Sequence, residues 1–174
     1  MTAPTLDRRA VRLGSTAAFV LTAAVLALVF APPFVPDGPR ALLRAAFAFL
    51  CHTLPDRSFH VGAHALGVCH RCTGIYAGLA IAAALFPLLA RHSAWLGRMA
   101  PRVLAAALVP IGVDWVLGAT GLWANTAGSR VATGLVFGLV GGLYLARGIA
   151  LAFVGPAPER RDAAGGLQPA HGRT

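Results

Sequence analysis

The chain contains no lysine: all 15 basic residues among its 174 are arginines, and only six residues are acidic. Without a lysine there is no Schiff base and no attachment of pyridoxal phosphate, and a Walker A phosphate loop lacks its essential residue. The haem c attachment motif, Cys-x-x-Cys-His, does not occur either. These absences exclude haem c and pyridoxal phosphate, and we expect no ATP-driven reaction from this chain alone.

Charge of either sign is scarce, because charged residues make up 12% of the sequence and hydrophobic residues 57%. Soluble domains are about 25% charged. The net charge of +9 comes from arginines at the ends of hydrophobic runs, which the positive-inside rule explains more simply than a nucleic-acid-binding patch does. The composition therefore predicts an integral membrane protein whose surroundings are the lipid bilayer, with no nucleic acid as partner.

Four hydrophobic runs approach the roughly 20 residues that a membrane-spanning helix needs. These runs cover about 13–35, 73–90, 103–120 and 131–154. They predict an all-α fold, a four-helix membrane bundle over 13–154 that follows a short N-terminal segment, 1–12. The tail, 155–174, is rich in glycine, proline, alanine and charge, and we expect it to be disordered. The connector 36–72 holds one apolar piece, 41–50, which is too short to cross and predicts an interfacial or re-entrant helix.

The distribution of arginines predicts the orientation. With both termini in the cytoplasm, ten of the 15 arginines lie inside and five outside, as the positive-inside rule requires. The connector 36–72 then faces the extracytoplasmic side of the cell membrane. The first run also has the basic start of a signal peptide, but it continues past a poor cleavage site at Val29-Phe30-Ala31, so we expect a retained anchor.

Glycines recur at every fourth position in two of the predicted spans. They are Gly74 and Gly78 in the second span, and Gly134, Gly138 and Gly142 in the fourth. Small residues at this spacing let helix backbones approach closely. We interpret them as packing within the chain, with a homo-oligomer or a partner membrane protein on the same faces as the alternative. The similarity of 73–79 to 133–139 also admits an internal duplication.

All three cysteines lie in the connector, in Cys51-His52 and in Cys69-His70-Arg71-Cys72. Three thiolates and one imidazole form a normal tetrahedral zinc site, and soft thiolates also suit copper(I). The Cys-x-x-Cys spacing is right for two ligands of one ion. The predicted metal ligands are Cys51, His52, Cys69 and Cys72.

Two other interpretations of the cysteines stay open. Cys69 and Cys72 could form a redox-active disulfide, because Cys72 stands at the start of the second span, where the helix dipole favours a thiolate, and Arg71 adds a positive charge. This arrangement is similar to that of quinone-linked disulfide-generating enzymes, although Cys51 stands alone where those enzymes have a second pair. Alternatively, a disulfide from Cys51 simply staples the loop of a structural or assembly protein.

Asp114 is the one carboxylate predicted to lie within a membrane span. Intramembrane carboxylates are costly and usually functional. At 1.5 Å of rise per residue, Asp114 lies roughly 9 Å from the outer end of its span, at the depth of the cysteines. It is a candidate metal ligand, a candidate proton acceptor in catalysis, or an ion-pair partner of Arg71 or Arg130.

Two segments resemble the DUF2085 family of small prokaryotic membrane proteins. Residues 51–59 read Cys-His-Thr-Leu-Pro-Asp-Arg-Ser-Phe, against the family pattern Cys-His-x-x-Pro-Glu-Arg-Ser-Phe, so that Asp56 replaces the usual glutamate. Residues 69–78 follow the second pattern, Cys-x-Arg-Cys-x-Gly-x-Tyr-x-Gly. The resemblance extends over about 47–145. It implies a genuine site but no particular reaction, because the family has no established activity.

The resemblance further implies that one pocket at the outer leaflet collects the distinctive residues of both motifs and of the later spans. These are Cys51, His52, Cys69, Cys72, Asp114, Asn125 and Arg130. We expect the segment 56–58 to cap this pocket. Arg57 and Arg71 would then hold an anion or a quinone head group, with Asn125 and Arg130 beside them.

Overall fold

The computed structural model describes residues 6–52 and 54–154 and is mainly helical. Its helices are α1 (Arg8–Phe30), α2 (Asp37–Ala48), α3 (His70–Leu89), α4 (Ser93–Ala119) and α5 (Ala127–Ala152). Strands β1 (Ser58–Val61) and β2 (His64–Cys69) form an antiparallel hairpin. Short 3₁₀ turns lie at Pro32–Phe34 (η1), Pro55–Arg57 (η2) and Ala90–His92 (η3). The predicted disorder of 155–174 concerns residues outside the described ranges.

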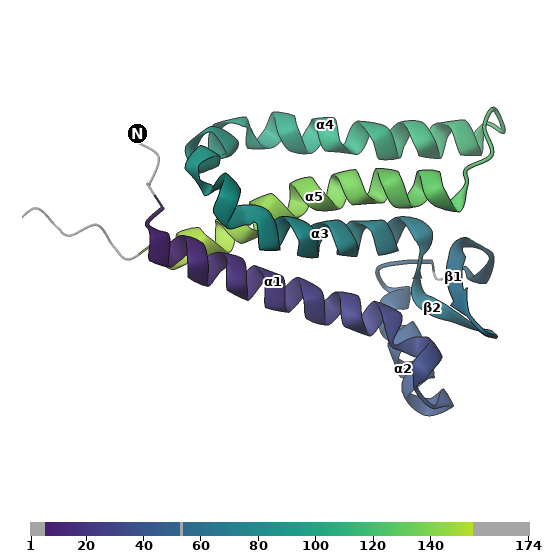
Figure 1. Ribbon diagram of the computed structural model, residues 1–174. Coiled ribbons are helices and arrows are strands. Elements are labelled where there is room, and N and C mark those ends of the chain that lie inside the picture. Colours follow the sequence, from purple (N-terminus) through teal and green to yellow (C-terminus); the bar gives the residue numbers. More distant parts are fainter. Residues whose placement is uncertain (1–5, 53, 155–174) are drawn as a thin grey trace, which may run out of the picture.

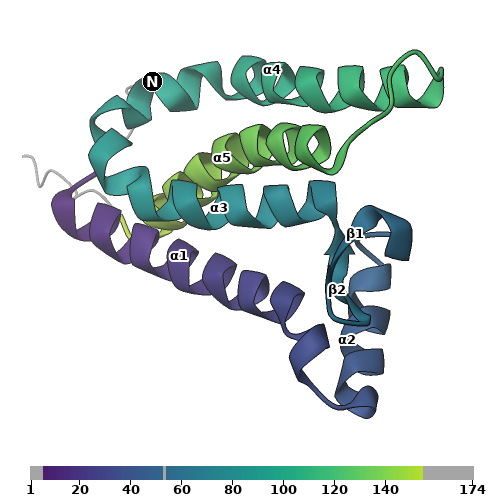
Figure 2. The same ribbon diagram turned by 45° about the vertical axis from the view of Figure 1, so that its right-hand side comes forward.

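The four long helices lie side by side, and α2 and the hairpin sit together at one end of them (Figures 1 and 2). Helices α3 and α5 run in the same direction, while α1 and α4 run in the opposite direction. The N-terminus of α1, the η3 turn and the end of α5 meet at the far end (Figure 1). The cysteine-bearing segments and the η3 turn therefore lie at opposite ends of the long helices.

Three stretches are long and apolar enough to cross a membrane: Arg8–Phe30, His70–Ala119 and Ala127–Ala152. The middle stretch contains both α3 and α4, which turn back on each other at η3 (Figure 1). The chain thus has the helices of a membrane protein. Four crossings, and an orientation with both termini inside, stay predictions.

The ends of two helices differ from the predicted spans. Helix α1 begins at an N-cap, Asp7, whose carboxylate accepts a hydrogen bond of 2.6 Å from the Ala10 amide. It ends at Phe30, before Pro32, whereas the hydrophobic run continues to residue 35. Proline stops the helix because it lacks an amide donor and clashes with the preceding turn. Helix α4 begins at Ser93, ten residues before the predicted span 103–120. Its first turns contain polar and charged residues, so a search for apolar runs does not include them.

The prediction of an all-α fold is wrong for the segment 58–69, which forms the β-hairpin. Val61 pairs with His64 across a tight turn, and Gly62 in this turn has a φ of 60°. Glycine adopts this left-handed conformation without steric cost. The sequence signal was weak because β1 is largely exposed, so that its side chains show no clear apolar alternation.

Helices α3 and α5 pack with their glycine faces against each other. A Cβ atom on Gly78 would lie 2.6 Å from the Leu135 carbonyl oxygen, and one on Gly142 would lie 2.6 Å from that of Leu79. Both distances are too short for any side chain. The glycines therefore serve packing within the chain, where the facing helix covers them. A homo-oligomer or a partner membrane protein stays a prediction.

Candidate functional site

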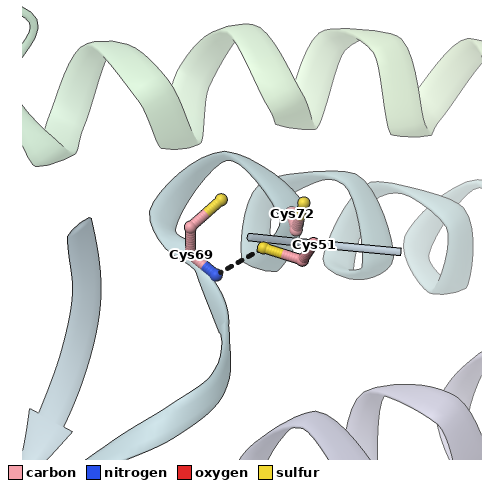
Figure 3. A group of neighbouring side chains, drawn as sticks. All are labelled: Cys51, Cys69 and Cys72. Carbon is pink, nitrogen blue, oxygen red and sulfur yellow. Dashed lines mark hydrogen bonds between the residues drawn. The ribbon is translucent and has the colours of Figure 1, made fainter. Parts of the chain in front are cut away.

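The three cysteines come from two stretches of the chain, Cys51 after α2 and Cys69 and Cys72 at the start of α3, and their side chains gather in one place (Figure 3). Cys51 follows α2, and its amide donates a hydrogen bond of 2.8 Å to the Phe47 carbonyl. Its side chain is 6% exposed and packs in an apolar cluster with Val29, Phe47 and Val68. Cys69 is the last residue of β2 and the N-cap of α3. Cys72 follows in the first turn of that helix.

The three Sγ atoms lie within 4.8 Å of one another, and all three thiols are free. The Cys69 amide also donates a hydrogen bond of 3.3 Å to the Cys51 sulfur. With zinc–sulfur bonds of about 2.3 Å, a tetrahedral site places its sulfurs about 3.8 Å apart. The cluster is therefore within about 1 Å of the geometry that one ion requires.

His52 is the one predicted ligand that stands apart from this cluster. Its side chain is exposed and lines the same cavity as the cysteines. Within residues 6–52 and 54–154, however, the only group of three or more candidate ligands consists of the cysteines alone. As described, the structure brings three of the four predicted ligands together and leaves His52 beside them.

Two thiols lie at the N-terminus of α3: Cys69 is its N-cap, and Cys72, which the sequence placed at the start of the second span, lies in its first turn. Helix α3 begins at His70, so Cys69 caps it. The pKa of the Cys69 thiol lies far below its usual value, chiefly because the Cys51 side chain hydrogen-bonds to it and the Cys72 side chain does so next. Burial acts in the opposite direction, and the backbone amides of Cys72 and Arg71 add to the lowering. Cys69 is therefore the cysteine best suited to exist as a thiolate.

The cysteine cluster opens onto a cavity of about 430 Å³, which all three cysteines line. A neighbouring cavity of about 440 Å³ shares four of its lining residues. The shared residues are Arg57, Arg71, Trp115 and Arg130. We call these two spaces together the double cavity.

Asp114 contributes to this region indirectly. Its side chain is 7% exposed and pairs with the guanidinium group of Arg71. The Asn125 side-chain amide donates to the same carboxylate oxygen at 3.1 Å and to the Asp114 carbonyl at 2.7 Å. Asp114 lies outside the cysteine group and does not line the double cavity. The sequence left three roles open for Asp114, and the structure shows one of them, the ion pair with Arg71.

The structure thus places the predicted residues in three groups. The cysteines, His52 and the arginines line the first cavity, Asn125 lines the second, and Asp114 lies behind Arg71. Sequence reasoning missed Trp115 and Gly118 as cavity residues. Gly118 lies four positions after Asp114 on the same helix, and residues at this spacing share a helix face. This spacing is the signal that could have identified Gly118.

The apolar helices and the cluster of three thiols define a membrane protein with a candidate metal or thiol site. Residues 51–144, more than half of the chain, match a family described as "Predicted membrane protein (DUF2085)", and the chain belongs to this family. The match begins at Cys51 and includes all three cysteines.

Two archaeal relatives are uncharacterized proteins. One, from Methanocaldococcus jannaschii, is 29% identical over 109 residues, which are 59% of this chain and 65% of the relative. The other, from Methanothermobacter thermautotrophicus, is 50% identical over 32 residues, which are 18% of this chain and 29% of the relative. The chain therefore matches less than two thirds of the length of either relative. No solved structure is significantly similar to it.

Proposed function

We propose that this protein binds one soft metal ion, zinc or copper(I), through Cys51, Cys69 and Cys72. The observation that carries the proposal is the meeting of three sulfurs within 4.8 Å, one of which, that of Cys51, comes from a stretch 18 residues before Cys69. Soft thiolates select these metals among the common ones. Zinc would need a fourth donor, for which His52 in the same cavity is the candidate, or it would keep an open position for another ligand.

The environment of the sulfurs supports a ligand role. The Cys69 amide already donates to the Cys51 sulfur, and outer hydrogen bonds of this kind orient ligands and tune their basicity. Cys51 is held rigidly by its apolar cluster, and Cys69 and Cys72 are fixed by the start of α3. The ligands therefore need little reorganisation when an ion enters.

We further propose a four-span arrangement in the cell membrane with the cysteines on the extracytoplasmic side. Two observations support it: α3 and α4 turn back at η3, and arginines concentrate at that end of the bundle. The arginines near that end are Arg8, Arg9, Arg12, Arg91, Arg98, Arg102 and Arg147. A cysteine introduced in η3 of a variant whose three native cysteines are replaced by serine should be labelled by a membrane-impermeant maleimide only after cell lysis. Labelling in intact cells would show the opposite orientation.

The metal proposal is tested by elemental mass spectrometry of protein purified in detergent without chelators or metal-affinity resin. Wild type should carry about one zinc or copper ion per chain, and Cys51→Ser and Cys72→Ser should lose it. His92→Asn, at the far end of the bundle, serves as the matched control and should retain the ion. His52→Asn separates a four-ligand site from a three-ligand one. The proposal would be refuted if wild-type protein is purified without metal and then takes up neither zinc nor copper(I) when these ions are added.

A second function, thiol–disulfide exchange, is favoured by the position of Cys69 at the N-terminus of α3. The Cys69 and Cys72 thiols would give two electrons and two protons to a quinone, which leaves a Cys69–Cys72 disulfide and a quinol. A thiolate of a partner dithiol would then attack Cys72 and form a mixed disulfide, with Cys69 leaving as the more stable thiolate. The partner's second thiolate would displace Cys72, so that the partner leaves with a disulfide and both cysteines of this chain are reduced again. Quinone reduction that survives metal chelation and stops in Cys69→Ser would establish this function. Reactivity of all three thiols in air-exposed protein would exclude it.

A further inference from the structure

The double cavity holds more positive charge than the structure neutralises. Arg57, Arg71 and Arg130 line both of its parts. Within the described part of the chain, only Arg71 among them has a carboxylate partner, Asp114. Arg130 is half-buried, so its charge has lost part of its contact with water, and no carboxylate among the described residues offsets this loss. The Cys69 thiolate lines only the first of the two cavities, and no acidic residue or cysteine in the described ranges lines the second. An excess of cations over anions around a cavity favours an anionic ligand.

Two helix N-termini add to this charge. Gly78 of α3 packs on Leu135 of α5, and Gly142 packs on Leu79, so the two helices run in parallel and begin at the same edge. Arg71 lies in the first turn of α3 and Arg130 in the first turn of α5. The positive ends of the two helix dipoles therefore point toward the region that the arginines already occupy.

Arg71 is held in place at the wall of the cavity. Its Nη2 is engaged by Asp114, so the carboxylate fixes the guanidinium plane. A guanidinium held in this way is preorganised to bind an oxyanion through more than one N–H group.

We propose that the double cavity is a binding site for a phosphate group, held by Arg57, Arg71 and Arg130. Three guanidinium groups and two helix N-termini match a multiply charged, multiply accepting anion better than a single carboxylate. Trp115 and Trp123 line the cavity beside the arginines and would pack against the remainder of the ligand. The phosphate group can belong to a lipid headgroup or to a soluble phosphate. Phosphate binding in the double cavity does not depend on a metal ion at the cysteines.

The test is equilibrium dialysis of inorganic phosphate against metal-free, full-length protein in dodecyl maltoside, which contains no phosphate. Chloride holds the ionic strength constant. Loss of one arginine–phosphate interaction should weaken binding roughly tenfold or more. We expect this for Arg57→Gln and Arg130→Gln. The matched control, Arg98→Gln, removes the same charge from an exposed position near η3 and should bind as wild type does.

A second arm distinguishes the two sources of phosphate. Short-chain phosphatidylglycerol is titrated against the same proteins, with the intrinsic fluorescence of Trp115 and Trp123 as readout. A lipid ligand should bind at least tenfold more tightly than inorganic phosphate, and a soluble ligand should show the reverse order. The proposal is overturned if neither probe binds, or if Arg57→Gln and Arg130→Gln bind as Arg98→Gln does. Measuring Cys72→Ser in parallel keeps this result separate from the fate of the metal site.

Discussion

Substitution of Asp114 by alanine should destabilise the protein more than any other single charge deletion in the described chain. The variant leaves the Arg71 guanidinium, 21% exposed, without its counter-ion and removes one of the two acceptors of the Asn125 amide, the carboxylate oxygen. Deleting one partner of a buried ion pair costs about 3–5 kcal/mol. Because Arg71 keeps some contact with solvent, we expect about 3 kcal/mol, which corresponds to a fall in Tm of about 6–12 °C for a chain of this size.

The assay is thermal unfolding in detergent, followed by circular dichroism. Asp37→Ala is the control, because it breaks an ion pair with Arg40 in which the aspartate is 95% exposed, and such surface pairs contribute about 0–1 kcal/mol. The double variant Arg71→Met/Asp114→Leu removes both charges and should recover most of the lost stability, since buried pairs are replaced by apolar residues at little cost. Equal Tm values for Asp114→Ala and Asp37→Ala would refute the reasoning, as would a double variant no more stable than Asp114→Ala.

Three further predictions concern packing, backbone conformation and the metal. Gly138→Val should abolish the folded, monodisperse state in size-exclusion chromatography, because the new Cβ would collide with the Ile75 carbonyl. Gly148 on the same helix has open space around it, so Gly148→Ala should raise the free energy of unfolding by up to about 1 kcal/mol. Gly62→Val should cost about 1–3 kcal/mol in thermal unfolding, because the residue has a φ of 60°; a neutral effect would contradict the described turn. Zinc or copper(I) should raise the Tm of wild type but not of Cys72→Ser, and the rise should shrink as the pH falls, because protons compete for the thiolates.

The apolar runs predicted the long helices because a membrane-spanning helix must satisfy its backbone internally and present apolar side chains for about 20 residues. They could not predict the hairpin, whose formation depends on β2 being covered by Phe47 and Val29 from distant parts of the chain. They also misplaced the end of the first span, where Pro32 outweighs continuing hydrophobicity.

At the site, motif spacing predicted which cysteines gather but not how they are divided among elements. Helix α3 begins at His70, a few residues before the predicted span, so that Cys69 caps the helix and Cys72 lies in its first turn. Asp114 was correctly singled out as unusual, because a carboxylate inside an apolar run demands a partner. Its choice of Arg71 over Arg130 depends on the rotation of α4, which no local pattern determines.

The close seam between α3 and α5 also bears on permeation. Where a Cβ atom on Gly78 or Gly142 would collide with the facing backbone, a file of water molecules has no room either. An ion held at the start of these two helices thus has no hydrated route between them toward η3. A ligand that binds at the cysteine end of the bundle therefore has to leave by a route other than this seam.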